Sequence, residues 1–542
     1  MRTLLVLLCL PALAHAQAPV TIDLTVASTG AAQTNAPVFT GVPFPPSTLA
    51  SAAQLDLTLA GSSVPRTAAV LTSWPNGSPR VVLVGFLTTL TAGQTKTYVI
   101  RCNSGPGAMS APIAWTRNLN ALALCPPAWY GASGVFGQRF LASADNTLLP
   151  AFETRMLAQY DAHGDPPSNT NPDVRNYYDH AHALITTLLR SGGPTSLVQR
   201  IWNEVNQYRE NEILHSGAYR GQYNAGTVTT NANPIPFNVV RRMFVQGLLE
   251  DWYVTGDQRS FDVAKEIADA YLADAYAQGA RFTWTERIPG WEIMGLCSMY
   301  EATLTQAYLD AANNVAQIEM DHQAAMAAKY PNQGGVAGQT GAFAQDRFNA
   351  WFDPSESTIS GGGSPFMTAL LCEGLIRLYW ITGSAAVRDS ILAACDWLAD
   401  AAYDPASASF WYVCKDTATG TTPSLNPMWF QMLGFARQMT GDPKYASIAS
   451  AVLAVNGWGN HIKEFNQGMR SSGQGLYLLQ APVGSAVMRW DGATGGAPPP
   501  PPPGGGGGGG GGCGASDTPS SWLLIALGVL VLSASRSVMR DA

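Results

Sequence analysis

A repeated helix-turn-helix pattern between residues 148 and 458 constrains the fold of this chain more than any other feature. Four copies have a proline near the start of an apolar helix, a Thr-Gly-Asp-like turn, and an alanine-rich helix after it, and a fifth, weaker copy runs from Tyr178 to Gly193. Proline suits a first helical turn, glycine accepts the left-handed conformation that ends a helix, and an adjacent Asp caps the next one. The turns are Ser191-Gly192-Gly193, Thr255-Gly256-Asp257, Thr303, Thr382-Gly383-Ser384 and Thr440-Gly441-Asp442.

The uneven spacing of these copies predicts loops of different length, unlike a regular solenoid. Five or six hairpins, each with an inner and an outer helix, predict an (α/α)5-6 toroid over residues 148–458.

The preceding part of the chain, residues 19–110, has a different period. Apolar and polar residues alternate in short runs, and turns with Pro and Gly at 41–46 and 74–78 separate them. A period of two is typical of half-buried strands. The runs are Val20 to Val26, Leu55 to Leu59, Val81 to Phe86 and Thr97 to Ile100. We therefore predict an N-terminal β-sandwich domain and a multidomain α+β fold class for the chain.

This region resembles the first domain of the exo-rhamnogalacturonan lyase-like proteins. The resemblance is carried by GVPFPPSTL from Gly41, LDLTLAGSSVPRTAAVLTSWPNGSPRVVLVGF from Leu55 and TAGQTKTYVI from Thr91. The Trp-Pro-Asn-Gly-Ser turn from Trp74 is its most specific element. Because that family places an α/α toroid after the sheet domain, the resemblance implies the same order here, and it implies polysaccharide lyase activity.

Three further segments follow the predicted toroid. Residues 459–490 contain short alternating runs and predict a short β-containing extension. Residues 491–512 hold a proline run and then a glycine run, which predict a disordered linker. Residues 513–542 contain an apolar stretch from Trp522 to Leu532, followed by basic residues. Because that stretch is shorter than the ~20 residues of a comfortable transmembrane helix, it favours a C-terminal hydrophobic sorting helix over a single-pass anchor.

The two ends of the chain predict export. The Gly-Cys-Gly motif, apolar helix and terminal arginines resemble the tripartite sorting tags of surface proteins in myxobacteria and other Gram-negative bacteria. That resemblance implies Cys513 as the attachment point and an envelope sorting protease as a partner. At the other end, residues 1–16 predict a signal peptide, with an apolar run after Arg2. We expect the protein on the outer surface of a Gram-negative envelope, or released after tail processing, with membrane contact only through the tail.

Charge and cysteine content indicate which partners and which cysteine states to expect. A net charge of -7 and the absence of a basic stripe argue against nucleic acid. In an oxidising compartment, Cys102 with Cys125 and Cys395 with Cys414 predict one or two disulfides. No CxxC motif or Cys/His cluster occurs in the sequence, which argues against a structural zinc site.

Candidate site residues follow from the predicted toroid, because loops before the inner helices surround a common cleft in such a fold. The candidate catalytic residues are Tyr178, His180, His215, Tyr219, Arg220, Glu286 and Arg287. The candidate substrate-binding residues are Trp284, Trp291, Asp346, Trp351, Tyr412 and Trp429. His182 faces away from His180 on a helix and is the weaker candidate of the two. Glu301 and Glu373 lie in the middle of helices and are interpreted as structural.

Two reactions remain open for these residues. Elimination across a uronic acid needs a cation or amide to neutralise the C6 carboxylate, and a Tyr or His to remove the C5 proton. Hydrolysis needs two carboxyl groups ~5 to 9.5 Å apart. Glu286, Glu292, Asp346 and Asp353 would supply those carboxyl groups.

We therefore expect a secreted, surface-attached carbohydrate-active enzyme that binds a polysaccharide or oligosaccharide. The family resemblance favours a polysaccharide lyase that cleaves uronic-acid-containing polymer by β-elimination. A glycoside hydrolase with a carboxylate pair and a non-catalytic glycan-binding surface protein are the alternatives. No motif specifies a cofactor, and a calcium ion held by loop carboxylates is left open.

Overall fold

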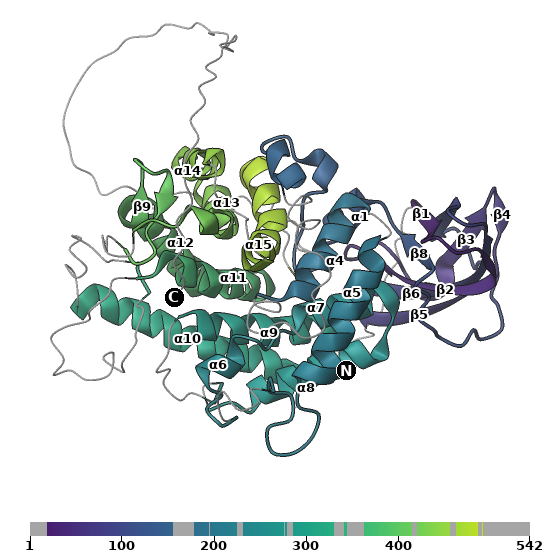
Figure 1. Ribbon diagram of the computed structural model, residues 1–542, viewed down its shortest axis with the longest axis horizontal. Coiled ribbons are helices and arrows are strands. Elements are labelled where there is room, and N and C mark those ends of the chain that lie inside the picture. The colour runs from purple at the N-terminus through teal and green to yellow at the C-terminus, as the bar shows by residue number, and fades with distance from the viewer. Residues whose placement is uncertain are drawn as a thin grey trace, which may run out of the picture. The chain divides into compact units, whose positions relative to one another are not determined.

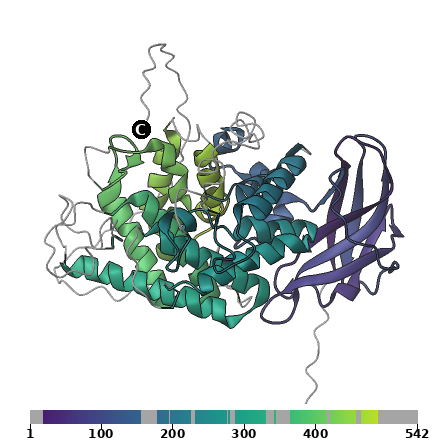
Figure 2. The same cartoon turned by 60° about the horizontal axis from the view of Figure 1, so that its bottom comes forward.

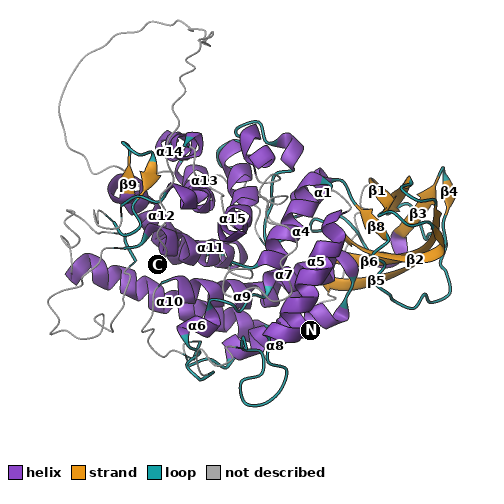
Figure 3. Cartoon of the chain, viewed as in Figure 1, coloured by secondary structure: helices purple, strands orange, loops and turns teal. Residues whose placement is uncertain are grey.

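The computed structural model describes residues 19–155, 178–193, 196–224, 231–275, 277–278, 286–329, 341–343, 363–414, 420–455, 462–485 and 490. These residues fall in one compact unit of the chain, Met1–Pro498. The predicted signal peptide, linker and sorting tag, with Cys513, lie outside the described residues and stay predictions. The described strands come mostly first along the chain and the helices follow (Figures 1 and 3).

The N-terminal domain holds two antiparallel sheets. The five-stranded sheet has the order β4-β3-β7-β1-β8 and the three-stranded sheet the order β2-β6-β5. The strands are β1 Val20–Ser28, β2 Gln33–Pro43, β3 Leu55–Leu59, β4 Ser62–Ser63, β5 Arg66–Ser73, β6 Pro79–Leu90, β7 Thr95–Cys102 and β8 Ala121–Leu124. All four alternating runs of the sequence lie in strands, which confirms a sheet-rich domain, and the β-sandwich itself stays a prediction.

Alternation of side chains builds the core of this domain. In β1, Ile22, Leu24 and Val26 are buried, and Leu24 lies opposite Tyr98 of β7. The prediction that residues 41–46 form only a turn is wrong, because β2 continues to Pro43. Gly41 packs so closely on the helical region that a Cβ there would lie 1.5 Å from the carbonyl oxygen of Tyr253.

The Trp-Pro-Asn-Gly-Ser turn joins β5 to β6. Trp74 is buried, and its indole N–H donates to the carbonyl oxygen of Phe44 at 2.8 Å. Asn76 Oδ1 accepts from the Ser78 backbone N–H at 3.0 Å and from its hydroxyl at 2.8 Å. The turn brings Arg80 under the indole, with Cζ 5.2 Å from the ring centroid.

In the described part of the chain, six inner helices form a closed ring. Each contacts the next in the order α4, α7, α9, α11, α13 and α15, and α15 contacts α4 again. Their bounds are α4 His180–Ser191, α7 Gln246–Thr255, α9 Arg287–Thr303, α11 Pro365–Thr382, α13 Phe430–Thr440 and α15 Ile462–Gln480. Nearly every residue of α7, α9 and α11 is buried, as expected for helices enclosed on all sides. Figure 2 shows the helices from a second direction.

Five inner helices are each followed by an outer helix, and this arrangement is the predicted α/α toroid. The outer helices are α5 Ser196–Gln207, α8 Gln258–Leu272, α10 Gln306–Lys329, α12 Ala385–Trp397 and α14 Pro443–Ala454. Shorter elements are α1 Pro127–Ser133, α6 Phe237–Val240, η1 Ala52–Gln54, η2 Ser143–Asp145, η3 Tyr208–Glu212, η4 Leu398–Ala402, η5 Pro423–Trp429, β9 Tyr403–Asp404 and β10 Ser409–Phe410. Among the described residues, no helix has both the length and the apolar character that crossing a membrane requires.

The repeated turns take the predicted form in three hairpins. Helices α7, α11 and α13 end at threonines, and the next glycines have φ values of 75°, 65° and 73°. The side chains of Asp257, Ser384 and Asp442 then accept backbone N–H groups of the following helix. Leu304, after Thr303, takes the left-handed conformation without being a glycine, with a φ of 56°.

The predicted strands in residues 459–490 are wrong for Ile462–Gln480, which form α15 and close the ring. Its glycines and serines are poor helix formers, so the local pattern does not indicate a helix. A Cβ at Gly475 would lie 2.5 Å from the carbonyl carbon of Phe430, and one at Gly473 would lie 3.0 Å from Arg190 Cδ. Close packing against neighbouring elements therefore requires these glycines and outweighs their low helix propensity.

The predicted disulfides are not formed. The six described cysteines are all buried and none is in a disulfide: Cys102, Cys125, Cys297, Cys372, Cys395 and Cys414. Burial raises the pKa of Cys102 to about 12, so this thiol is protonated at neutral pH.

Candidate functional site

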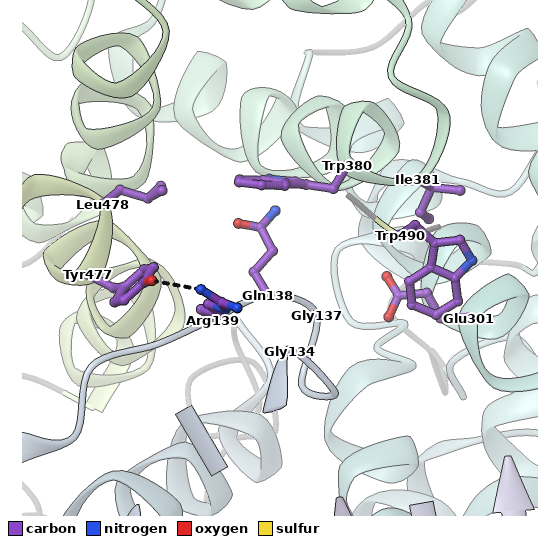
Figure 4. A pocket seen from close by; sticks show the side chains of 10 residues that line it. All are labelled: Gly134, Gly137, Gln138, Arg139, Glu301, Trp380, Ile381, Tyr477, Leu478 and Trp490. Carbon is purple, nitrogen blue, oxygen red and sulfur yellow. Dashed lines mark hydrogen bonds between the residues drawn. The ribbon is translucent and has the colours of Figure 1, made fainter. Parts of the chain in front are cut away.

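Three adjoining hollows lie among the inner helices and the segment from Gly134 to Phe140. The aromatic hollow, of about 400 Å³, is shown in Figure 4. The central hollow has about 290 Å³ of empty space and the histidine hollow about 310 Å³. Gly137 and Gln138 line the first two, while Arg470 and Gln474 line the last two. We treat the three as one candidate site.

Their linings differ in chemistry. The aromatic hollow is lined by Gly134, Gly137, Gln138, Arg139, Glu301, Trp380, Ile381, Tyr477, Leu478 and Trp490. The central hollow is lined by Gly137, Gln138, Gln246, Met294, Glu373, Arg377, Gln431, Arg470 and Gln474. The histidine hollow is lined by Phe136, Phe140, His182, Thr186, Leu189, Met469, Arg470, Gly473 and Gln474.

Most polar residues of the site come from pairs spaced four residues apart on inner helices. Residues at this spacing lie on the same face of a helix, so each pair projects toward the ring interior together. The pairs are His182 and Thr186, Gln246 and Glu250, Glu373 and Arg377, and Arg470 and Gln474. This spacing, in otherwise apolar helices, is the signal that an analysis of helix starts misses.

Arg470 is the residue common to the central and histidine hollows. Its Nε donates to Glu373 Oε2 at 2.7 Å, and Nη2 donates to Gln246 Oε1 at 2.6 Å. Its Cζ lies 4.6 Å from the ring centroid of Trp291. Burial raises the pKa of Glu373, although the neighbouring Arg470 opposes that shift. The guanidinium is thus held on three sides.

Several buried atoms of the central hollow have no hydrogen-bond partner in the described part of the chain. They are Arg470 Nη1, Glu373 Oε1 and Gln138 Oε1. An unsatisfied buried polar group costs about 1–3 kcal/mol, and such groups are normally paired. A ligand with hydroxyl or carboxylate groups would satisfy both the donor and the acceptors.

Arg377 forms the second fixed cation of the central hollow. Its Nε and Nη2 donate to Glu301 Oε1 and Oε2 at 2.8 and 2.9 Å. Burial acts to lower the pKa of Arg377, but the Glu301 carboxylate raises it overall. A Cβ at Gly137, where φ is 90°, would lie 3.1 Å from Cζ of Arg377. Only glycine therefore lets the chain pass this close to the guanidinium.

His182 and Glu250 form a buried pair at the histidine hollow. His182 Nδ1 lies 2.9 and 2.8 Å from the two carboxylate oxygens of Glu250. Burial raises the pKa of Glu250, and the His182 ring opposes that shift. A carboxylate on one ring nitrogen fixes the orientation and tautomer of the imidazole and leaves the other nitrogen for proton transfer.

The backbone before α4 holds this histidine in place. Tyr178 and Asp179 both have left-handed conformations, with φ values of 70° and 60°. Asp179 accepts the backbone N–H of His182 at 3.1 Å and that of Gly247 at 3.0 Å. One carboxylate therefore caps α4 and joins it to α7, which offsets the strain of two non-glycine residues at positive φ.

The predicted residues at the start of α4 and in α9 are buried next to the site but do not line it. Tyr178 packs on Trp291 with centroids 5.6 Å apart, and His180 Nδ1 lies 2.7 Å from Asn466 Oδ1. Trp291 is buried, and Arg470 covers its ring. The prediction of Trp291 as a sugar-stacking surface is therefore wrong, because the ring supports a guanidinium instead.

Three predicted catalytic residues lie away from the ring interior. His215 Nδ1 is 2.6 Å from Glu266 Oε2, and Arg220 Nη2 donates to Glu266 Oε1 at 2.9 Å. Glu266 belongs to the outer helix α8, and Tyr219 is exposed. The structure therefore does not bring His215, Tyr219 and Arg220 together with Tyr178 and His180.

The remaining predicted residues do not line the hollows either. Glu286 is buried directly before α9, and burial raises its pKa well above the ordinary value. Arg287 lies over Phe366, on which Tyr412 stacks at 4.9 Å. Trp429 is fully buried against Phe410, so it does not offer a face to a sugar. Trp284, Asp346, Trp351 and Asp353 lie outside the described residues.

Glu292, an alternative hydrolytic carboxylate, faces away from the hollows. It is buried beside Asp274, and burial together with that second carboxyl raises the pKa of Glu292 well above its ordinary value. In the described part of the chain, no group of three or more His, Cys, Asp or Glu residues is arranged to hold a metal ion.

Sequence comparison gives no relative for this chain. No family model matches it, and no curated protein matches it.

Solved structures with a similar arrangement of helices exist. A cellobiose 2-epimerase from Spirochaeta thermophila is 13% identical with a TM-score of 0.42, and the match covers 60% of this chain and 98% of the epimerase. A glycosyl hydrolase family 88 protein from Bacteroides vulgatus is 12% identical with a TM-score of 0.43, covering 62% and 99%. A polysaccharide lyase is 10% identical with a TM-score of 0.43, covering 63% and 99%. At values this low, the likenesses carry no conclusion about the reaction of this chain.

Proposed function

We propose that this chain is a carbohydrate-active enzyme, a polysaccharide lyase that cleaves uronic-acid-containing polymer by β-elimination in the ring interior. The observation that carries the proposal is the His182–Glu250 pair in a hollow that also contains Arg470. A fixed imidazole beside a fixed guanidinium is the combination that elimination next to a carboxylate requires. The resemblance of the N-terminal domain to the exo-rhamnogalacturonan lyase-like proteins supports the same class.

The reaction assigns a role to each group. Nη1 of Arg470 and of Arg377 would donate to the C6 carboxylate and stabilise the negative charge that develops when C5 loses its proton. His182 Nε2 would take that proton, and Glu250 would stabilise the imidazolium that results. A C4–C5 double bond then forms as the C4–O bond breaks, and the leaving oxygen takes a proton from the imidazolium or from water.

The side-chain amides would orient the sugar. Gln431 Nε2 donates to Gln474 Oε1 at 2.8 Å, and both residues line the central hollow with Gln246. Amide groups donate and accept at once, which suits sugar hydroxyls. In the aromatic hollow, Trp380 and Trp490 add apolar faces of the kind that pack on sugar rings.

A glycoside hydrolase is the second candidate, and the carboxylates favour it. Glu250 and Glu373 are buried with raised pKa values, as a general acid requires. We further propose export, with the tail processed at Cys513 by an envelope sorting protease so that the enzyme is held at the cell surface or released. No step of either reaction calls for a cofactor.

The test is turnover by the full chain on pectic and other uronic polymers. A lyase gives products that absorb near 235 nm, because elimination leaves a C4–C5 double bond conjugated with the carboxylate. New reducing ends without that absorbance would indicate hydrolysis, and binding without turnover over a broad glycan panel would contradict both. His182→Gln should lower kcat/KM by about 100-fold or more. His215→Gln is the control, because His215 binds Glu266 of the outer helix α8 and lines none of the three hollows, so the activity of this variant should not change.

A further inference from the structure

Arg80 extends from β6 of the sheet domain into the helical ring and is fully buried there. Its Nη1 donates to the carbonyl oxygen of Glu301 at 2.7 Å, and Nη2 donates to the Val135 carbonyl oxygen and to Glu301 Oε2 at 2.5 and 2.9 Å. Its Cζ lies 4.7 Å from the Trp490 ring centroid and 5.3 Å from that of Tyr253. The cation of one domain is thus enclosed by residues of the other.

Glu301 is shared by two cations. It binds Arg80 from the sheet domain and, through both oxygens, Arg377 of α11. All three side chains are nearly inaccessible to solvent, at 0, 2 and 10% exposure for Arg80, Glu301 and Arg377. Two guanidinium groups and one carboxylate leave a buried net charge of one positive unit.

Arg377 carries this charge to the central hollow, which it lines. Nε and Nη2 are bound to Glu301, and for Nη1 the described residues provide no hydrogen-bond acceptor. A Cβ at Gly137 would lie 3.1 Å from Arg377 Cζ and Nη1, so the backbone at this glycine passes close to the guanidinium. The Nη1 edge of Arg377 is therefore the part of the triad that a ligand in the central hollow can reach.

We propose that Arg80 is a positioning residue that makes the central hollow selective for an anionic sugar, although Arg80 does not itself line that hollow. By sharing the Glu301 carboxylate, Arg80 keeps Arg377 from being fully neutralised and fixes its orientation. Without Arg80, Glu301 and Arg377 form a simple neutral pair, and attraction for a carboxylate in the hollow falls. The sheet domain is then part of the sugar site and not a separate binding module. The sugar class rests on the proposed function, while the coupling of Arg80 to Arg377 does not.

The test is a double-mutant cycle on the full chain, with binding of galacturonate and of galactose measured by titration calorimetry. Arg80→Met and Arg377→Met should each weaken galacturonate binding by about tenfold, and the double variant should bind no more weakly than Arg377→Met. Galactose binding should not change. Arg80→Lys restores the charge and should recover most of the affinity. Glu301→Gln, which removes the only anion of the triad, should bind galacturonate at least as tightly as the unchanged protein.

A matched control separates this role from general support of the fold. Arg117 also joins the first part of the chain to the ring, since it donates to Asp251 Oδ1 at 2.9 Å and to Asp257 Oδ2 at 2.8 Å, but it does not line a hollow. Arg117→Met should lower Tm and leave galacturonate binding unchanged.

Three results would overturn the proposal. The effects of Arg80→Met and Arg377→Met on galacturonate affinity could be additive, or Arg117→Met could lose as much affinity as Arg80→Met. The unchanged protein could also fail to bind galacturonate. If Arg80→Met does not fold, Arg80→Lys and Glu301→Gln still decide it, because a purely structural role predicts loss of Tm without a change in sugar selectivity. Turnover of uronic polymer that does not depend on Arg80 would leave the proposed function standing and sink this inference. Non-additive effects in the cycle, without any turnover of uronic polymer, would support this inference and contradict the proposed function.

Discussion

The sheet domain and the helical ring bury arginine in different ways. Arg66 of β5 is fully buried, and its side chain has one described partner, the Met109 sulfur at 2.8 Å from Nη1. Burial lowers the pKa of Arg66. In the ring, Arg377 and Arg470 each pair with a carboxylate, and both line the central hollow.

This difference shows what the ring interior is built for. Apolar residues of similar volume often stabilise a core as well as a buried ion pair does, because desolvation of the charges offsets their attraction. Fixed ion pairs with unpartnered edges beside a hollow are therefore better explained by a ligand than by stability. Arg66, which has the charge of Asp56 nearby, lines none of the three hollows, and substitutions can separate the two cases.

The largest effect should come from Glu301→Ala. This change leaves Arg80 and Arg377 as unpaired buried cations, and it should lower the free energy of unfolding by about 3–5 kcal/mol. Lys265→Ala is the control, because Lys265 pairs with Asp269 where both side chains are about half exposed, at 48% each. It should change stability by about 0–1 kcal/mol. Urea unfolding measures both, and equal effects would contradict the contrast between buried and surface pairs.

Arginine-to-methionine substitutions in the two regions should have opposite results. Arg470→Met should lower kcat/KM by about 100-fold or more, since it removes a donor to developing charge. Arg66→Met should leave kcat/KM unchanged and keep or raise Tm, because it replaces an under-paired buried cation with an apolar side chain. Kinetics on a uronic polymer and thermal unfolding check the pair. A loss of activity in Arg66→Met would contradict the distinction between arginines that line a hollow and arginines that do not.

Stability should fall as pH rises, through the buried carboxyls outside the hollows. The pKa of Glu292 and that of Glu286 are raised above the ordinary 4.5 by burial. The folded state therefore binds more protons than the unfolded state, so their contribution is complete below about pH 4.5 and is lost as pH rises through the folded pKa values. Glu292→Gln should flatten the dependence of Tm on pH above about 4.5, where the unfolded carboxyl has lost its proton. An unchanged slope would show that Glu292 does not titrate in this range.

The smallest effect should come from reducing agent. Because the six described cysteines are buried and form no disulfide, dithiothreitol should not change Tm. Thiol counting in denaturant should find all of them free. A fall in Tm would mean that a disulfide between Cys102 and Cys125, or between Cys395 and Cys414, does form in the protein.

Local patterns predict most of the secondary structure. The alternating runs lie in β1, β3, β6 and β7, and the Thr-Gly turns end α7, α11 and α13, because both signals depend on neighbouring residues only. Helix α15 escapes prediction, since its glycines have low propensity and are explained only by contact with Phe430 and Arg190. The need for glycine at position 41 is likewise not visible in the sequence, because it comes from the close approach of the Tyr253 carbonyl group in the helical region.

The candidate site shows a sharper limit. The starts of the helices gave Tyr178, His180 and Glu286 as candidates. The hollows are instead lined by side chains along the length of the inner helices, from Gln246 at the start of α7 to Leu478 near the end of α15, and by the segment from Gly134 to Phe140. Glu301 and Glu373 are interpreted from the sequence as structural, and each in fact holds an arginine that lines the central hollow. Spacing of four residues within a helix could have indicated Glu373 with Arg377 and Arg470 with Gln474. No sequence spacing joins Arg80 to Glu301.

The sequence by itself determined a sheet-rich domain, a series of helical hairpins with capped turns, and the aromatic and charged residues that a sugar site draws on. These properties come from periodicity and from the conformational preferences of Gly, Pro, Thr and Asp. The tertiary structure alone decided that α15 closes the ring, which faces are interior, and that Arg80, Glu301 and Arg377 share one buried charge. Those facts depend on contacts between residues far apart in the chain, where packing and desolvation outweigh local preference.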